Sequence, residues 1–221
     1  MIANQNRVGF WLAVLTALLT AISFSIAIFG SPSYKFSYPY TPEFIAVDYA
    51  WLIPAIILMP TFVALMVFIH YYGPNEKKIF SQIALSFAIV CAVLLMADYF
   101  VQWTVVLPSI TSKETVGLSL FTQYNPHGFF VGLESLGYLM MNLALLFLAP
   151  VFGDGRLQKS LRWLFVASFV LAVGSFIGIT AAGYDVVRFE VVIITTDWIV
   201  LIVSGILLSV LFKRLAKMPQ G

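Results

Sequence analysis

Charged residues are scarce in this chain. Only 10% of its 221 residues are Asp, Glu, Lys or Arg, and 61% are hydrophobic. Soluble domains contain about 25% charged and about 45–50% apolar residues. This composition therefore excludes an ordinary soluble domain and indicates a chain that is solvated mainly by lipid. The few basic residues also form no cluster that would suit a nucleic acid, so we expect no nucleic-acid partner.

Cysteine and histidine are almost absent. The single cysteine, Cys91, excludes an intrachain disulfide. The two histidines, His70 and His127, are predicted to lie on opposite faces of the membrane, which argues against a haem held between them. No lysine falls within an apolar run, and the chain has no H-E-x-x-H, C-x-x-C, Walker or G-x-S-x-G motif. We therefore expect no cofactor and no metal site, and the sequence assigns no catalytic residue.

Long apolar runs dominate what is present. A helix that crosses a bilayer needs about 20 mostly apolar residues. Six runs meet this length, at residues 8–30, 44–71, 79–107, 128–152, 161–183 and 191–212. The first is too long for the apolar core of a cleaved signal peptide, which has about 7–15 residues. We predict an all-α, polytopic membrane protein, with residues 1–221 forming a single domain of six transmembrane helices.

Basic residues are distributed unequally between the two sets of connections. Nine of the twelve fall on the side of the N-terminus: Arg7, Lys77, Lys78, Arg156, Lys159, Arg162, Lys213, Arg214 and Lys217. The other three are Lys35, Lys113 and Arg188. Short loops rich in Lys and Arg remain in the cytoplasm. This bias predicts that both termini are cytoplasmic and that the protein is a multi-pass component of the cell (inner, cytoplasmic) membrane.

The outer connection at residues 108–127 carries helical signals of its own. Thr111 and Glu114 have the spacing of a capping box, and apolar residues follow at roughly helical intervals before Asn125-Pro126. This pattern predicts a short amphipathic helix on the outer membrane surface over residues 112–124.

Four carboxylates fall inside the predicted spans, and all lie in the outer half of the membrane. They are Asp48, Asp98, Glu134 and Asp197. At 1.5 Å per residue, they lie about 6 to 14 Å below the outer helix ends, with Asp98 the deepest. A carboxylate in the middle of a membrane helix costs about 2.5–3.5 kcal/mol on insertion scales. We therefore expect these side chains to face the bundle interior or a polar pocket.

The residues beside two of the acids favour such a pocket. Asp98 and Gln102 are four residues apart, as are Glu134 and Tyr138, so each pair shares a helix face, and Asn142 lies another turn inward from Tyr138. We predict an outward-facing acidic pocket between the second, third, fourth and sixth spans. Asp98 and Glu134 would be its principal carboxylates, oriented by Gln102 and Tyr138. Asp197 and Asp48 complete the set.

An acidic pocket would bind a cation, a proton or a small amphipathic molecule, for transport or sensing. Two alternatives stay open. The first is an intramembrane acid/base enzyme that acts on a lipid, with Glu134 or Asp98 as proton donor and a lateral opening that leads to it. The second is an accessory or scaffold subunit of a membrane complex, or a homo-oligomer, in which the acids only hold the helices together. Small residues in the fifth span, such as Gly174 and Gly178, would then face a partner.

The segment LFTQYNPHGFFVGLESLGYLMMNLALLFLAPVF, within residues 98–152, resembles an uncharacterised group of prokaryotic six-span integral membrane proteins. The resemblance covers about a quarter of the chain. It implies a small polytopic inner-membrane protein. No activity is known for that group, so the resemblance carries over no functional residues.

Overall fold

The computed structural model describes residues 2–30, 47–114, 116–183 and 186–217. The described residues are helical with no strands, and six of their helices are long and apolar enough to cross a membrane, which confirms the predicted number of spans. The six long helices are α1 (Ile2–Gly30), α3 (Leu52–Tyr72), α4 (Lys78–Val101), α6 (Phe129–Leu148), α7 (Arg156–Ala181) and α8 (Val186–Ala216). The chain is therefore a multi-pass membrane protein.

Short helical segments connect or extend the long helices. They are α2 (Val47–Ala50), η1 (Asn75–Lys77), η2 (Gln102–Val106), α5 (Leu107–Thr111), η3 (Leu118–Leu120) and η4 (Ala149–Val151). Two of them, η2 and α5, continue α4 without interruption, so the third span extends to Thr111. The second span begins at Leu52, later than the predicted residue 44, and Pro54 lies in its first turn, where a missing N–H costs no helical hydrogen bond.

The six long helices pack in chain order around a closed ring. Each contacts the next, from α1 through α3, α4, α6 and α7 to α8, and α8 packs against α1. A further contact between α6 and α8 crosses the ring. In their most apolar windows, 56% of the residues of α3 and α6 are buried, compared with 17% for α7. The helices α3 and α6 are thus the most buried of the long helices, and α7 faces lipid over most of its surface.

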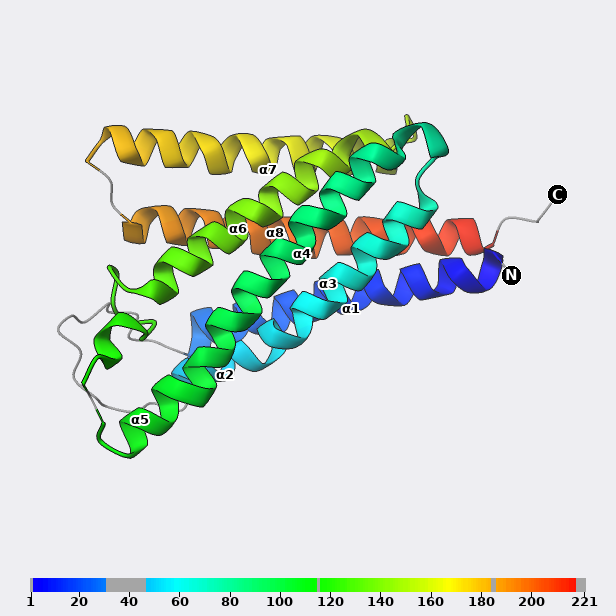
Figure 1. The fold of residues 1–221 in the computed structure, drawn as a ribbon. Helices are drawn as coiled ribbons and strands as arrows, with labels where there is room; N and C mark the ends of the chain where they lie inside the picture. Colours follow the sequence, from blue (N-terminus) through cyan, green and yellow to red (C-terminus); the bar gives the residue numbers. More distant parts are fainter. Residues whose placement is uncertain (1, 31–46, 115, 184–185, 218–221) are drawn as a thin grey trace.

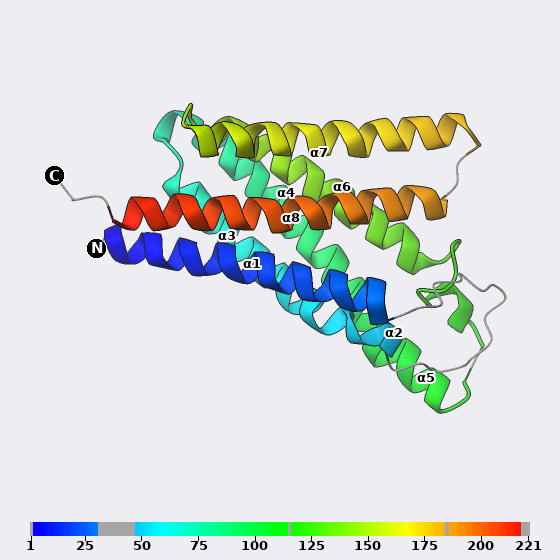
Figure 2. The same ribbon diagram turned by 180° about the vertical axis from the view of Figure 1, so that it is seen from behind.

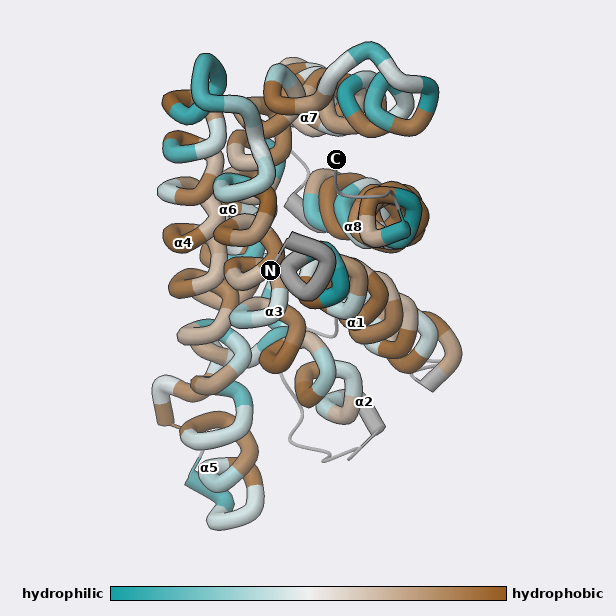
Figure 3. Tube along the Cα trace, turned by 90° about the vertical axis from the view of Figure 1, so that its right-hand side faces the viewer, coloured by the Kyte–Doolittle hydropathy of each residue, from teal (hydrophilic) through white to brown (hydrophobic). Residues whose placement is uncertain are grey.

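The helix α1 begins and α8 ends at the same end of the bundle (Figure 1). We call this the termini end and the opposite one the distal end. Viewed along the bundle from the termini end, hydrophobic residues line every long helix (Figure 3). The excess of Lys and Arg at the termini end is the basis for the prediction that it is cytoplasmic.

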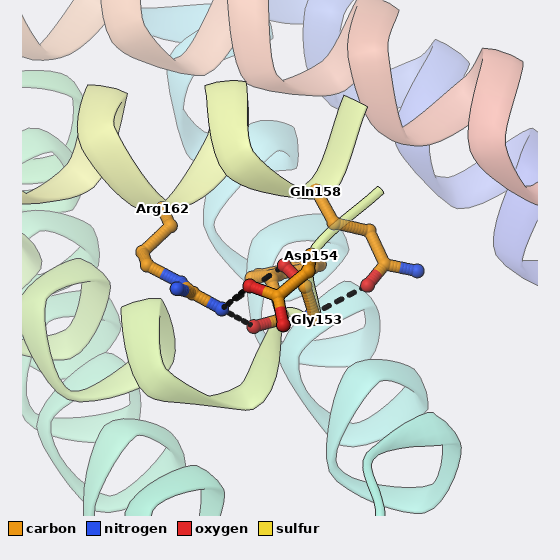
Figure 4. A network of polar contacts seen from close by, with 5 residues as sticks. Gly153, Asp154, Gln158 and Arg162 are labelled. Carbon is orange, nitrogen blue, oxygen red and sulfur yellow. Dashed lines mark hydrogen bonds and ion pairs between the residues drawn. The ribbon is translucent and has the colours of Figure 1, made fainter. Parts of the chain in front are cut away.

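The loop at residues 152–155, at the termini end, is held by side chains of α7 (Figure 4). Arg162 Nη2 donates to the carbonyls of Phe152, at 2.5 Å, and Gly153, at 3.0 Å, and lies 3.6 Å from Asp154 Oδ1. Gln158 Oε1 accepts a hydrogen bond from the Gly153 amide at 2.5 Å. Arg162 therefore satisfies backbone carbonyls of the loop that follows η4, which gives it a structural role.

The predicted surface helix at residues 112–124 is wrong. Within the described part of this segment, η3 is the one helical turn, and bends and turns surround it. Lys113 has a φ of 60° and Gly117 a φ of 75°. Both angles lie in the left-handed region, which an α-helix cannot include, so local propensity was overridden by the path of the loop.

Candidate functional site

A polar stripe runs down one face of α6. Glu134, Tyr138 and Asn142 follow one another at intervals of four residues, and all three side chains are buried. Residues at this spacing lie one above another on a helix. Over eight residues the stripe spans about 12 Å along the helix axis. It therefore carries polar groups from the distal third of the bundle towards its middle, as the sequence spacing predicted.

The upper part of the stripe is a directed chain of hydrogen bonds. Tyr99 Oη, from α4, donates to Glu134 Oε1 at 2.8 Å and lies 3.1 Å from Tyr138 Oη. Because the single Tyr99 proton points to Glu134, Tyr138 donates to Tyr99. Trp198 Nε1, from α8, donates to Tyr138 in turn. All the protons in this chain point towards Glu134, so the chain stabilises negative charge on that carboxyl group.

A second carboxyl group meets Glu134 from α8. Glu190 is 4% exposed, and its carboxyl group lies within hydrogen-bonding reach of that of Glu134. A hydrogen bond between two carboxyl groups requires a proton on at least one of them, so the two side chains can share a proton in this arrangement. The other oxygen, Glu190 Oε2, is buried and has no hydrogen-bond partner among the residues that the structure describes.

Asp98 is buried on α4 and interacts electrostatically with both Glu134 and Glu190. Its Oδ2 atom has no hydrogen-bond partner within the described part of the chain. The structure thus brings Asp98 and Glu134 into one acidic region, together with Glu190, and Asp98 takes no part in the hydrogen-bond chain described above.

Gln102 does not orient Asp98. Its Nε2 donates to the Phe121 carbonyl at 2.6 Å, and its Oε1 accepts from the Gln123 amide at 3.3 Å. Gln102 therefore holds the connection between α5 and α6, which we call the distal loop (residues 112–128), against the end of α4. Gln102 begins the π-helical turn η2, and Pro108 follows two residues after its end. Pro108 lacks an N–H for the helical ladder, and a wider π turn is one way to accommodate this interruption. Such a turn rotates the residues after it relative to α4.

Asp197 belongs to a separate cluster nearer the middle of the bundle. Asn142 Nδ2 lies 2.8 Å from both carboxylate oxygens and 3.0 Å from the Tyr138 carbonyl. Ser168 Oγ, from α7, lies 2.6 Å from Asn142 Oδ1 and 3.3 Å from Asp197 Oδ1. This cluster joins α6, α7 and α8 through side chains that satisfy one another. It has the form of interhelical hydrogen bonding that holds a bundle together.

The last predicted site residue, Asp48, lies in α2, but its side chain is outside the described part of the structure. Tyr138 is linked to Glu134 through Tyr99, which forms hydrogen bonds with both. Four residues that contact this region were missed from the sequence: Trp51, Tyr99, Glu190 and Trp198. Glu190 was placed just outside the sixth span, although its spacing of seven and eight from Asp197 and Trp198 puts all three on similar faces of α8.

A cavity of about 260 Å³ lies beside the two glutamates. Its lining residues come from the distal ends of α1, α6 and α8, from the residue before α3 and from the distal loop. They are Phe24, Ala27, Ile28, Trp51, Gln123, Phe130, Glu134, Glu190, Val191, Ile194, Thr195 and Trp198. The pocket was predicted to lie between the second, third, fourth and sixth spans. The cavity is instead lined mainly by the first, fourth and sixth spans, and Asp98 is not among its lining residues.

Aromatic rings form much of the cavity wall. Trp198 packs against Trp51 at 5.8 Å and against Phe24 at 5.5 Å between ring centroids. Trp51 also meets Tyr99 edge to face at 5.3 Å. Trp51 Nε1 is buried without a hydrogen-bond partner among the described residues. The residues that line the cavity therefore include two carboxyl groups and several aromatic rings.

No protein-family model, curated protein or solved structure matches this chain.

Proposed function

We propose that this protein binds a small organic cation, such as a protonated or quaternary amine, in the cavity beside Glu134 and Glu190, as part of transport or sensing. The observation that carries the proposal is the carboxyl pair. Tyr99 donates a hydrogen bond to one member of the pair, Glu134, and Glu190 Oε2 is buried with no hydrogen-bond partner among the described residues. Asp98 adds a third acid nearby. A buried carboxylate without a partner is costly, and a bound cation would remove that cost.

The cavity wall supports an organic cation over a simple metal ion. The indole faces of Trp51 and Trp198 attract cations and suit ammonium groups that carry alkyl substituents. At about 260 Å³ the cavity is slightly smaller than most drug-sized sites, which have about 300–1,000 Å³. It would hold a head group rather than a large molecule. The described lining residues include no Lys, Arg or His, so an anion would find no charged partner.

Glu190→Gln and Glu134→Gln are expected to weaken binding of benzyltrimethylammonium at least about tenfold, because each removes the carboxyl group that carries or shares the charge. Quenching of tryptophan fluorescence in detergent micelles would report binding, since Trp51 and Trp198 line the cavity. Glu76→Gln is the matched control, because Glu76 is exposed in η1 at the termini end. Equal affinity of the wild type and both cavity variants, or no saturable quenching, would refute the proposal.

Binding is also expected to depend on pH. A cation binds to the ionised form of the carboxyl pair, so protons and the cation compete for it, and affinity falls as the pH is lowered. The slope is at most about tenfold per pH unit, for one proton displaced by one cation. Among the described residues, the ionisable groups in the region are Asp98 and Tyr99 on α4, Glu134 and Tyr138 on α6, and Glu190 on α8.

The measurement is the dissociation constant of benzyltrimethylammonium in buffers from mildly acidic to mildly alkaline, compared between the wild type and Glu190→Gln. The probe carries a permanent charge, so any change in affinity with pH comes from the protein. An affinity that does not change with pH in the wild type would contradict the exchange of a cation for a proton.

A further inference from the structure

Two residues that line the cavity are exposed on the surface of the bundle. They are Ile28 from α1 and Val191 from α8, which are 51% and 52% exposed, and we call the opening between them the mouth of the cavity. Both residues lie within helices that are long and apolar enough to span the membrane, about one turn from their distal ends. A large apolar side chain exposed at this level of a membrane helix contacts lipid. The cavity thus has an apolar entrance on the lipid side and an acidic base inside the bundle.

The arrangement of α1 and α8 accounts for this entrance. The two helices lie side by side towards the termini end and diverge towards the distal end (Figure 2). Gly205 of α8 marks the close contact: a Cβ built at this position would lie 2.7 Å from the Ala13 carbonyl of α1. From Gly205 to Val191 the distance along α8 is about 21 Å. The cavity is lined by the diverging parts of both helices.

The charges of the lining residues restrict the ligand further. Zwitterionic phospholipids carry a phosphate as well as an amine, and a buried phosphate needs Arg, Lys or several N–H donors. The described lining residues provide no basic side chain. A molecule with a single positive head group and an uncharged chain is the better complement. Its head would lie against Trp51, Trp198 and the two glutamates.

We infer that the ligand is a cationic amphiphile taken from the lipid phase, with its head group at the Glu134–Glu190 pair and its alkyl chain leaving between α1 and α8 into the bilayer. This inference rests on the proposed function and specifies its substrate class and route of entry. The carboxyl pair sets the preference for positive charge, and the apolar mouth accepts the chain.

Chain length tests whether the alkyl chain of the bound probe lies in lipid. The probes are tetramethylammonium and alkyltrimethylammonium ions with butyl, octyl and dodecyl chains, and the protein is held in phosphatidylcholine nanodiscs. If the bound chain stays in lipid, the dissociation constant, referred to free probe in water, falls by up to about fourfold for each added CH₂. If the chain is excluded from lipid in the bound state, no such gain is expected.

Blocking the mouth supplies the second measurement. Ile28→Trp and Val191→Trp are expected to weaken dodecyltrimethylammonium binding at least about tenfold, because each places a bulky ring where the chain would pass. Leu18→Trp and Ile199→Trp are the matched controls. Both positions are exposed apolar residues on the same helices, but neither lines the cavity.

The possible outcomes separate the two proposals. The inference is supported if affinity rises with chain length in the wild type and in the control variants, and if Ile28→Trp and Val191→Trp remove this rise. Saturable binding of tetramethylammonium with no gain from longer chains, or equal effects of mouth and control variants, overturns entry from lipid and leaves the proposed cation site standing. Absence of saturable binding for every probe overturns both.

Discussion

Replacement of Gly205 by valine is expected to destabilise the bundle by about 3 kcal/mol or more, because the contact between α1 and α8 leaves no room for a side chain. A Cβ at this position would lie 2.7 Å from the Ala13 carbonyl oxygen, 2.8 Å from Ala17 Cβ and 3.1 Å from the Ala17 amide nitrogen. Two of these atoms belong to the backbone, so relief requires α1 to move away from α8. Small residues commonly permit such close approach between membrane helices.

The measurement is reversible unfolding in mixed micelles with increasing SDS, followed by circular dichroism. Gly178→Val is the matched control, because a Cβ at Gly178 on α7 meets nothing within 4 Å among the described atoms. The control is expected to unfold near the wild type. Equal stability of the two valine variants would show that α1 and α8 do not approach at Gly205. A loss of cavity binding in Gly205→Val would further link this contact to the geometry of the mouth.

Replacement of Asn142 by leucine is expected to cost about 3 kcal/mol, at the upper end of the range for a buried polar group left without its partner. Asp197 is 0% exposed, and Asn142 Nδ2 is the donor to both of its oxygens. Without this amide, the described groups leave Ser168 as the remaining donor, at 3.3 Å from one oxygen. The same unfolding measurement in SDS checks this expectation.

The double variant Asn142→Leu/Asp197→Leu separates the causes of that loss. When both polar partners are replaced by apolar groups, the penalty for an unsatisfied buried carboxyl group disappears, so much of the stability should return. A double variant that is less stable than either single variant would contradict this account and would indicate that Asp197 has further partners. Cation binding should persist in the double variant, since neither residue lines the cavity.

These variants test two different uses of polar groups in one bundle. Around Asp197 the side chains satisfy one another, which is the property of a structural cluster. Around Glu134 and Glu190, oxygen and nitrogen atoms are buried without partners among the described residues, and a cavity lies beside them. The sequence placed Asp197 and Glu134 in one group because both are acids at a similar depth. Only the hydrogen-bond partners distinguish them.

The sequence was sufficient for the number of membrane spans. Lipid cannot satisfy backbone N–H and C=O groups, so each apolar run of this length must form a helix, whatever it packs against. The buried face of α6 also followed from the four-residue spacing of Glu134, Tyr138 and Asn142. The predicted helix at 112–124 failed because a connection outside the apolar runs has no such requirement. Its path depends on the helices it joins and on contacts such as that of Gln102 with Phe121.

What the sequence determined about this protein is thus a local property: which segments are apolar enough to cross a membrane and which of their faces are polar. The tertiary structure decided which of those faces meet. It paired Glu134 with Glu190 and Tyr99, gave Gln102 to the distal loop, and separated Asp197 from the cavity. The physical reason is that helix formation depends on neighbouring residues, whereas the meeting of side chains depends on the separation and rotation of whole helices. Contacts between helices, such as that of Gly205 with Ala13, fix the separation and rotation of the helices, and the sequence of one apolar segment alone does not determine them.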